Sequence, residues 1–517
     1  MSVDARNAES ARRLAQWSET RHCIDGALSM LENSTDYIPK LSGQTDNEYR
    51  AYVTRAPFFE ATARTQQGLT GLVFDKPAEI TLPDAVAFLA DDCDLAGTDL
   101  EAFGRKLVNE ALATAWGVVV VAHNGDPANP GTLARPSGRP YLRYYPAESV
   151  LDWTFGTIVS PSGVTRGLTS LRLHEVVSQA TGEFTSAAVD QIRVLDLEVG
   201  LEFRERVFQL VEVKRGNKTT TEWAMVSEAR PLKGGARLNY IPAALVDTGG
   251  RGMPSTSPLA AIAGLNISHW RTTADIEHAA HFCGLPTPYI TGVSAPSVRA
   301  GDIRDAIDGG ATGFENLRRR DAAPSGPTIT LGSPRAIVLE NANAKVGFLE
   351  FAGAGLTPLR DLRQDKESAM AVLGARIIAP EKRAAESGEA LTIRRASENA
   401  PLVGVALSVS EALTLACIYA ADWQGVQNAP SGVAVRLNTV FVDETLDGNT
   451  LSSLVSAWQA GAMSLASLLF NLKRGNRLPD DVTADDEADR IAEEGPALGA
   501  IGLNPDEPPA DDAPPVG

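Results

Sequence analysis

Residues 139–250 interrupt the pattern of an otherwise helical chain. This range holds short segments that are rich in β-branched and aromatic residues and are separated by polar or glycine-containing turns. They are RPYLRYYPAESVLDW, LTSLRLHEVV, DQIRVLDLE, LEFRERVFQLVEV and TEWAMVSE. Such segments are typical of antiparallel strands. The sequence therefore predicts an α+β fold in which a mainly β module interrupts a mainly helical chain.

The region before this module is predicted to be helical. Residues 1–35 have a helical pattern, and the segment from Glu48 has apolar residues at helical spacing. Pro57 is expected to begin a second helix in that segment, since proline is tolerated in the first turn. Leu100–Ala115 is predicted to be another helix, and Trp116–Val121 a buried strand.

Further helices are predicted after the β module. Ser257 and Pro258 form a helix start, with serine as the cap and proline in the first turn. That helix is expected to run to about residue 283. A segment interrupted by glycine, proline and serine then fills 284–346. The remaining predicted helices are 356–375, 389–424 and Leu451–Leu472.

The net charge of −18 is concentrated near the C-terminus. From Asp480 onward twelve acidic residues accompany one basic residue, Arg490, so this segment contributes −11 and the rest of the chain −7. Beyond Gly495 the composition is dominated by Pro, Asp, Glu, Ala and Gly, which bury too little apolar surface to offset the entropy of ordering. The acidic tail at 498–517 is therefore predicted to be disordered. The mildly acidic body lacks the basic face by which proteins grip duplex DNA.

The sequence contains no motif that favours an enzyme. The string nearest to a phosphate-binding loop, Arg215–Thr219, lacks the first glycine and the spacing of GxxxxGK[ST]. GxSxG and HExxH motifs do not occur. Cys23, Cys93, Cys283 and Cys417 are far apart, which predicts neither a zinc site nor a disulfide framework. No cofactor and no catalytic residue are expected.

One pair of histidines permits two interpretations. His278 and His281 lie three residues apart on one face of a predicted helix, with Asp275 and Glu277 nearby. They could share a metal ion. A polar helix face or a subunit contact is the favoured interpretation, so no metal site is predicted.

No membrane segment is predicted either. No stretch offers the roughly 18 uncharged apolar residues that a membrane span needs. The first residues, with Asp4, Arg6, Glu9 and Arg12, lack the apolar run of a signal peptide. The protein is expected to be cytosolic or to assemble from cytosolic subunits.

Two basic groups are candidate contact sites. Arg318, Arg319 and Arg320 form the densest basic run. Two interpretations are equally consistent with this run. One is a contact with DNA or an acidic partner, and the other is a solvated helix end. Lys382 and Arg383 lie in a polar segment before the helix at 389–424 and are ambiguous by themselves.

A third candidate is a face of mixed charge on the helix predicted at 356–375. Asp361 and Asp365 lie one helical turn apart, among Arg360, Arg363 and Lys366. Alternating signs at this spacing predict a solvated face or one that forms ion pairs between subunits.

Taken as a whole, the chain resembles the portal proteins of tailed bacteriophages. The resemblance is to a portal-like family of phage proteins that contain an uncharacterised domain. The resemblance covers roughly residues 35–425. Its most specific stretches are Tyr49–Pro77, Arg139–Trp153, Pro258–Gly292 and Leu349–Ile378. They are signatures of a family and contain no catalytic motif.

The resemblance implies a division of the chain into the regions of a portal subunit. The two long helices on either side of 284–346 correspond to the stem, and the segment between them to the clip. The implied regions are 1–256 (N-terminal helices and β-rich wing), 257–283 (stem helix), 284–346 (clip), 347–378 (stem helix), 379–390 (tunnel loop), 391–429 (long wing helix), 430–497 (crown or crown-proximal helices) and 498–517 (acidic tail).

The resemblance also implies a role, partners and site residues. Portals form rings, usually dodecameric, at one capsid vertex and act as the conduit for DNA packaging and ejection and as a platform for the tail. The implied partners are further copies of the chain, the major capsid protein, the large terminase, a head–tail adaptor and double-stranded DNA. The protein is then expected in the virion after assembly in the host cytoplasm. The implied site residues are Glu381, Lys382 and Arg383 in the tunnel loop, Arg318, Arg319 and Arg320 in the clip, and Arg360, Asp361, Arg363, Asp365 and Lys366 at a subunit interface.

The implied role suits the charge, because a channel with cationic walls would hold each phosphate and hinder sliding. Two alternatives remain open. One is a monomeric head-completion or minor capsid protein, which a mass measurement in solution separates from a ring. The other is a phage-borne hydrolase, which would need a catalytic constellation.

Overall fold

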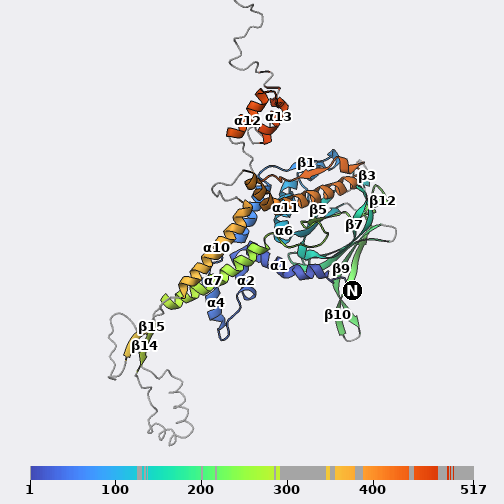
Figure 1. Ribbon diagram of the computed structural model, residues 1–517. Helices are drawn as coiled ribbons and strands as arrows, with labels where there is room; N and C mark the ends of the chain where they lie inside the picture. The colour runs from blue at the N-terminus through green and yellow to red at the C-terminus, as the bar shows by residue number, and fades with distance from the viewer. Residues whose placement is uncertain are drawn as a thin grey trace, which may run out of the picture. The chain divides into compact units, whose positions relative to one another are not determined.

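The computed structural model shows an α+β fold (Figure 1). The structure describes residues 2–124, 131–132, 135–136, 138–198, 202–215, 218–284, 287–291, 345–349, 355–378, 388–441, 448–474, 486–487, 489–490 and 493. They form two compact units. The sheet unit comprises Met1–Ala11, Gly68–Ser255 and Ile377–Gly517, and the helical unit comprises Arg12–Gln67 and Thr256–Arg376.

The helical unit contains two long helices, α7 (Ala260–Gly284) and α10 (Leu356–Ile378). A pair of short antiparallel strands, β14 and β15, follows α7 and precedes α10 in the chain. Three helices, α1, α5 and α10, begin in one unit and end in the other. The remaining elements are α1 (Ala8–Asp25), α2 (Ala27–Glu32), α3 (Ser34–Tyr37), α4 (Asp46–Arg55), α5 (Ala61–Val73), β14 (Thr287–Thr291) and β15 (Lys345–Leu349).

The core of the helical unit lies between α7 and the N-terminal helices. Trp270 of α7 is fully buried, and its indole N–H donates to the Ala56 carbonyl at 3.1 Å. Tyr52 and Val53 of α4 belong to the same buried cluster. This packing explains why residues 12–67 group with the chain after residue 256.

Local signals in the sequence explain where these helices begin. The Thr45 hydroxyl accepts from the Glu48 N–H while the Glu48 carboxylate accepts from the Thr45 N–H, a capping box that starts α4. The Ser257 hydroxyl accepts from the Leu259 N–H at 3.1 Å just before α7, as predicted for that helix start. Pro57, in contrast, does not begin a helix, because α5 starts only at Ala61.

The sheet unit contains the β-rich module. Its strands and short helices are β1 (Glu79–Thr81), η1 (Asp84–Leu89), β2 (Trp116–His123), β3 (Gly131–Thr132), β4 (Arg135–Pro136), β5 (Pro140–Pro146), η2 (Ala147–Ser149), β6 (Val150–Ser160), β7 (Gly163–Ala180), β8 (Ser186–Leu197), β9 (Phe203–Arg215), β10 (Lys218–Ala229), β11 (Leu232–Lys233), β12 (Ala236–Arg237), β13 (Ala243–Asp247), η3 (Ala429–Ser431) and β16 (Ala434–Arg436). Its helices are α6 (Leu100–Thr114), α11 (Gly388–Trp423), α12 (Gly448–Gln459) and α13 (Leu465–Arg474).

Two antiparallel sheets organise this unit. The larger sheet has the order β10-β9-β8-β7-β6, so each strand pairs with its neighbour in the chain. The smaller sheet has the order β13-β2-β5. The central strand β2 holds Gly117, where a Cβ would lie 2.5 Å from the Tyr144 hydroxyl of β5, so a larger residue would displace the Tyr144 ring. The strands from β5 to β13 confirm the strands that the sequence predicts in 139–250.

The helix α11 forms part of the core of the sheet unit. From Pro401 to Trp423 it is long and apolar enough to cross a membrane by composition, contrary to the expectation from the sequence. In the structure 67% of the most apolar window is buried within the protein, which is typical of a core helix. Val409 and Leu413 are fully buried, and Asp422 near its end is bound by Lys233 and Tyr240.

The helix predicted at Leu451–Leu472 is wrong in one respect. The structure has two helices there, α12 and α13. Gly461 lies between them with a φ of 73°, a backbone conformation that ends a right-handed helix and is accessible to glycine.

Candidate functional site

The antiparallel pair of α7 and α10 carries the predicted interface residues (Figure 1). Lys366 Nζ of α10 donates to the Ser268 carbonyl at 3.1 Å and to Thr272 Oγ1 at 2.6 Å. A Cβ built on Gly374 would lie 3.6 Å from Ile262 Cδ1. The residue numbers of the contacting positions therefore decrease along α7 as they increase along α10, which shows that the two helices are antiparallel.

Several polar contacts join these two helices. His269 of α7 is buried, and its Nε2 lies 3.0 Å from Glu367 Oε1 of α10. Arg363 Nε lies 3.2 Å from the same carboxylate oxygen, one turn earlier on α10. Burial and the charge of Arg271 lower the pKa of Lys366. Hydrogen bonds and charges therefore join α10 to its own chain, together with the buried Met370.

The outer face of α10 exposes three large apolar side chains beside its charged ones. Leu362, Val372 and Leu373 are 45%, 39% and 38% exposed. With Ala369 they lie on one side of the helix, within about 100° of one another, and the exposed Asp365 lies on the same side. An amphipathic helix of a globular chain normally buries apolar side chains of this kind. α10 thus presents to solvent the side chains that most helices place in a core.

The five predicted interface residues do not share one environment. Arg360, Asp361 and Asp365 are exposed, as a contact with another subunit requires. Arg363 and Lys366 are half-buried. Their ion pair and hydrogen bonds lie within the chain. The sequence could not separate these two groups, because it does not show which side of α10 faces α7.

The other predicted site residues lie outside the described residues. They are Arg318, Arg319 and Arg320 of the expected clip and Glu381, Lys382 and Arg383 of the expected tunnel loop. The acidic tail at 498–517 also lies outside them. Of the clip range, the structure describes parts of the two strands, β14 and β15, together with the end of α7.

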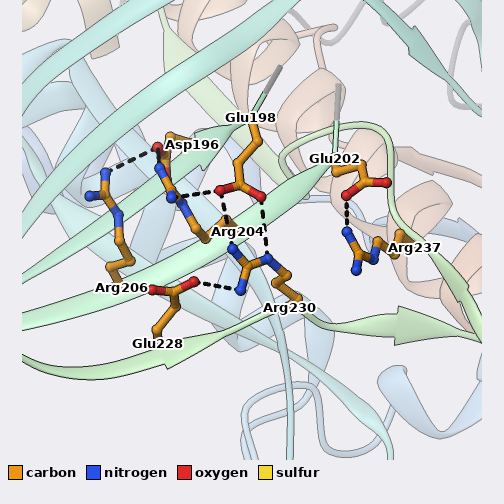
Figure 2. A network of polar contacts seen from close by, with 8 residues as sticks. All are labelled: Asp196, Glu198, Glu202, Arg204, Arg206, Glu228, Arg230 and Arg237. Carbon is orange, nitrogen blue, oxygen red and sulfur yellow. Dashed lines mark hydrogen bonds and ion pairs between the residues drawn. The ribbon is translucent and has the colours of Figure 1, made fainter. Parts of the chain in front are cut away.

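A network of eight charged residues fastens one end of the larger sheet, and the sequence analysis did not single it out. Figure 2 shows that each guanidinium points toward a carboxylate. Asp196 accepts from Arg204 at 2.6 Å and from Arg206 at 3.0 Å. Glu198 accepts from Arg204 at 2.6 Å and from Arg230 at 3.1 Å. The other ion pairs are Arg230 with Glu228 and Arg237 with Glu202.

This network balances its own charge. Four guanidinium groups meet four carboxylates, so it leaves no excess of positive charge to attract phosphates. Hydrogen bonds from Arg230, together with nearby arginine charges, lower the pKa of Glu198. The hydrogen bonds that Arg204 donates to Asp196 raise the pKa of Arg204. The arrangement keeps both signs charged and fixes the ends of three strands.

Glu175 of β7 forms a second, buried cluster between the two sheets. Its side chain is 2% exposed and accepts hydrogen bonds from Tyr145 of β5 and Gln191 of β8. Arg193 Nε of β8 donates to it at 2.8 Å, and Arg143 of β5 lies 3.3 Å away. Burial raises the pKa of Glu175, but hydrogen bonds and charge from Arg193 outweigh burial and hold this pKa below its ordinary value. The cluster joins the larger sheet to the smaller one.

The predicted polar helix face at the two histidines lies at the end of α7. Asp275 accepts from the Tyr52 hydroxyl at 2.6 Å, and the His278 ring meets the Tyr52 ring edge-on, with 5.1 Å between centroids. Within the described ranges, no group of three or more His, Cys, Asp or Glu side chains is placed to hold a metal ion. Asp275 and His278 thus contact Tyr52 of α4, in the same unit.

One open cavity lies on the larger sheet. Its volume is about 590 Å³, and its lining is Ser2, Val3, Asp4, Phe208, Leu210, Thr221, Glu222 and Trp223. The N-terminal segment forms one wall, held by Arg172, which donates to the carbonyl of Val3 at 3.0 Å. The lining includes no histidine or cysteine, and its two carboxylates, Asp4 and Glu222, do not suggest a reaction.

Comparisons with known proteins give one family match. Residues 258–424, less than half of the chain, match a domain of unknown function, DUF4055. This range contains α7, α10 and α11. The description of that family assigns it no function. No curated protein matches the chain.

Solved structures give two similarities at low identity. One is a chain of the virion of a native gene transfer agent particle, with 12% identity and a TM-score of 0.35, covering 82% of this chain and 90% of that chain. The other is a chain of the neck of an empty gene transfer agent particle, with 12% identity and a TM-score of 0.38, covering 85% of this chain and 95% of that chain.

Proposed function

We propose that this chain is a portal subunit of a phage-like particle, and that its copies close into a ring, dodecameric as the sequence resemblance implies. The ring acts as the conduit for DNA packaging and ejection and as a platform for the tail. The order of elements supports this role: α7, β14, a long insertion, β15 and α10 follow one another as stem, clip and stem do in portals.

The outer face of α10 is the observation that carries the proposal. Leu362, Val372 and Leu373 point away from the contact with α7, where polar groups already join the two helices. An exposed apolar stripe of this kind marks a contact with another protein. A second copy of the chain is the partner that a ring requires, and the exposed charges of Arg360, Asp361 and Asp365 orient that contact.

The rest of the chain is assigned in keeping with this ring. The α7 and α10 helices form the stem, α11 the long wing helix, and α12 with α13 the crown-proximal region. Residues 284–346 form the clip, where Arg318, Arg319 and Arg320 contact DNA or a partner. Residues 379–390, the last three of which belong to the start of α11, form the tunnel loop. The partners are the major capsid protein, the large terminase, a head–tail adaptor and double-stranded DNA, and the ring stands at the portal vertex of the virion after assembly in the host cytoplasm.

The charges of the sheet unit suit a conduit and give no support to catalysis. The guanidinium groups of Arg204, Arg206 and Arg230 are committed to carboxylates, so this end of the sheet has no excess positive charge to hold a phosphate. We infer a structural role without catalysis, as the lack of a catalytic motif in the sequence indicates.

A mass measurement tests the ring directly. Native mass spectrometry and negative-stain microscopy of the full chain are expected to show one closed species whose mass is a fixed multiple of 54.8 kDa. Leu362→Asp combined with Val372→Asp places charge on the outer face of α10 and is expected to reduce the ring fraction at least tenfold at equal concentration.

The matched control is Leu28→Asp, at a position on α2 that is 70% exposed and lies in the same unit. It is expected to leave the ring fraction unchanged. If the parental chain stays monomeric at every salt and protein concentration, the portal proposal fails and a monomeric head-completion or minor capsid protein replaces it.

A further inference from the structure

The larger sheet opens at one end, between its strands β8 and β9. The pairing of β8 with β9 stops at Gln191 opposite Gln209. The two flanking pairs continue toward that end, because β7 pairs with β8 and β9 pairs with β10 up to their hairpin turns. Within the described part of this sheet, residues 186–190 and 210–215 therefore pair on one side alone. We call these two strand segments the fork.

The sequence of β8 explains why its pairing with β9 ends there. One step beyond the last pair, the register would place Asp190 opposite Leu210, and opposite residues point to the same face of a sheet. The Asp190 carboxylate instead lies 2.9 Å from Nε2 of His174 on β7. Residues 186–190, SAAVD, include two alanines and an aspartate, which are depleted in strands, whereas β9 continues as LVEV. β8 is therefore a poor partner for this part of β9.

The part of β9 in the fork also carries an exposed apolar side chain. Leu210 is 45% exposed and lines the open cavity on the larger sheet together with Phe208 and Trp223. A branched apolar residue paired opposite Leu210 would point to the same face and cover it. Asp190 is unsuited to that place, because a carboxylate against an apolar side chain loses its hydration. This strand thus presents both backbone hydrogen-bonding groups and an apolar side chain to a partner.

We propose that the fork binds an extended segment of a partner protein, which adds to β9 as an antiparallel strand. The class of occupant follows from the chemistry of the edge, because a row of backbone N–H and C=O groups at strand spacing is matched by another extended backbone. The bound segment carries valine, isoleucine or threonine opposite Leu210. This binding is a further function and does not rest on the proposed ring, since the fork is complete within one chain.

Hydrogen exchange tests whether this edge of β9 is open. In the full chain, amides of residues 210–213 that face the fork are expected to exchange at least tenfold faster than amides of residues 204–208. Ala188→Thr combined with Asp190→Val makes β8 a better partner and is expected to extend its pairing with β9, which slows that exchange at least tenfold. Thr157→Val, at an exposed position of β6 outside the fork, is the matched control and is expected to change nothing. Equally slow exchange in both ranges of the parental chain overturns the open edge.

A fluorescent peptide of alternating valine and threonine, blocked at both ends, is the probe for the binding itself. Fluorescence polarisation with the full parental chain is expected to show saturable binding. The same peptide N-methylated at every residue keeps its side chains but has no backbone donors, so it is expected to bind at least tenfold more weakly. Ala188→Thr with Asp190→Val is expected to weaken binding of the unmodified peptide at least tenfold, because β8 then occupies the edge, whereas Thr157→Val leaves it unchanged. Absence of saturable binding, or equal affinity for the two peptides, contradicts strand addition.

Discussion

At the scale of single residues, Glu175 shows how a buried charge is kept ionised. Its carboxylate is 2% exposed, yet Arg193, Tyr145 and Gln191 all donate to it. Removing one partner of such a cluster leaves the others buried and unpaired, which is far costlier than losing an exposed ion pair. The cluster therefore makes the joint between the two sheets dependent on pH.

Glu175→Gln is expected to lower the free energy of unfolding of the sheet unit by about 3 kcal/mol at pH 7. Because the pKa of Glu175 is lowered in the folded protein, its stabilising effect is present above the ordinary value of 4.5 and is lost as the pH falls through the folded pKa. The difference between parent and variant should therefore shrink below pH 4.5. Urea unfolding at several pH values measures it, with exposed Glu183→Gln as the control. A difference that stays constant down to pH 2 would contradict this account.

At the scale of elements, the N-terminal segment acts as a cover for the larger sheet. Val3 packs against the buried cluster of Leu151, Ile192 and Val194. Arg6 reaches the carbonyls of Glu148, at 2.6 Å, and Val150, at 3.2 Å. Residues 2–7 thus hold β6, β7 and β8 together from one face.

Val3→Asp is expected to loosen this cover, because it places a carboxylate against an apolar cluster at a cost of about 1–3 kcal/mol. Amide hydrogen exchange in β6–β8 should become roughly tenfold faster, which corresponds to 1.4 kcal/mol. Val164→Asp, at a 72% exposed position in β7, is the control that should leave the exchange rates unchanged. Equal rates in both variants would show that the segment does not stabilise the sheet.

At the scale of the whole molecule, the proposed ring places residues 379–390 in the channel. The sequence there pairs Glu381 and Glu386 with Lys382 and Arg383, so local charge nearly cancels, which suits transient contact with sliding DNA. Lys382→Glu combined with Arg383→Glu is expected to leave rings intact while it lowers the amount of packaged DNA severalfold. Quantification of nuclease-protected DNA checks this, and packaging at the parental level in rings of normal shape would remove the loop from the mechanism.

The sequence by itself determined the kinds of elements and several of their ends. β-branched segments in 139–250 predicted strands because side-chain shape acts locally on the backbone. Ser257 and Pro258 predicted the start of α7 because capping needs only the next few residues. The α+β class followed from these local preferences. Single prolines and glycines predicted helix ends less well. Pro57 does not begin a helix, and Gly461 separates two helices where the sequence predicted one.

Only the tertiary structure decided which faces and which distant residues meet. Glu175 and Arg193 are brought together by strand register, which depends on pairing across a hairpin and not on either residue alone. Lys366 turns toward α7 and Leu362 toward solvent because the packing of α10 selects one side of a helix whose sequence carries charges all round. The sequence predicted a candidate interface on this helix, and long-range packing set which of its residues face α7 and which face solvent.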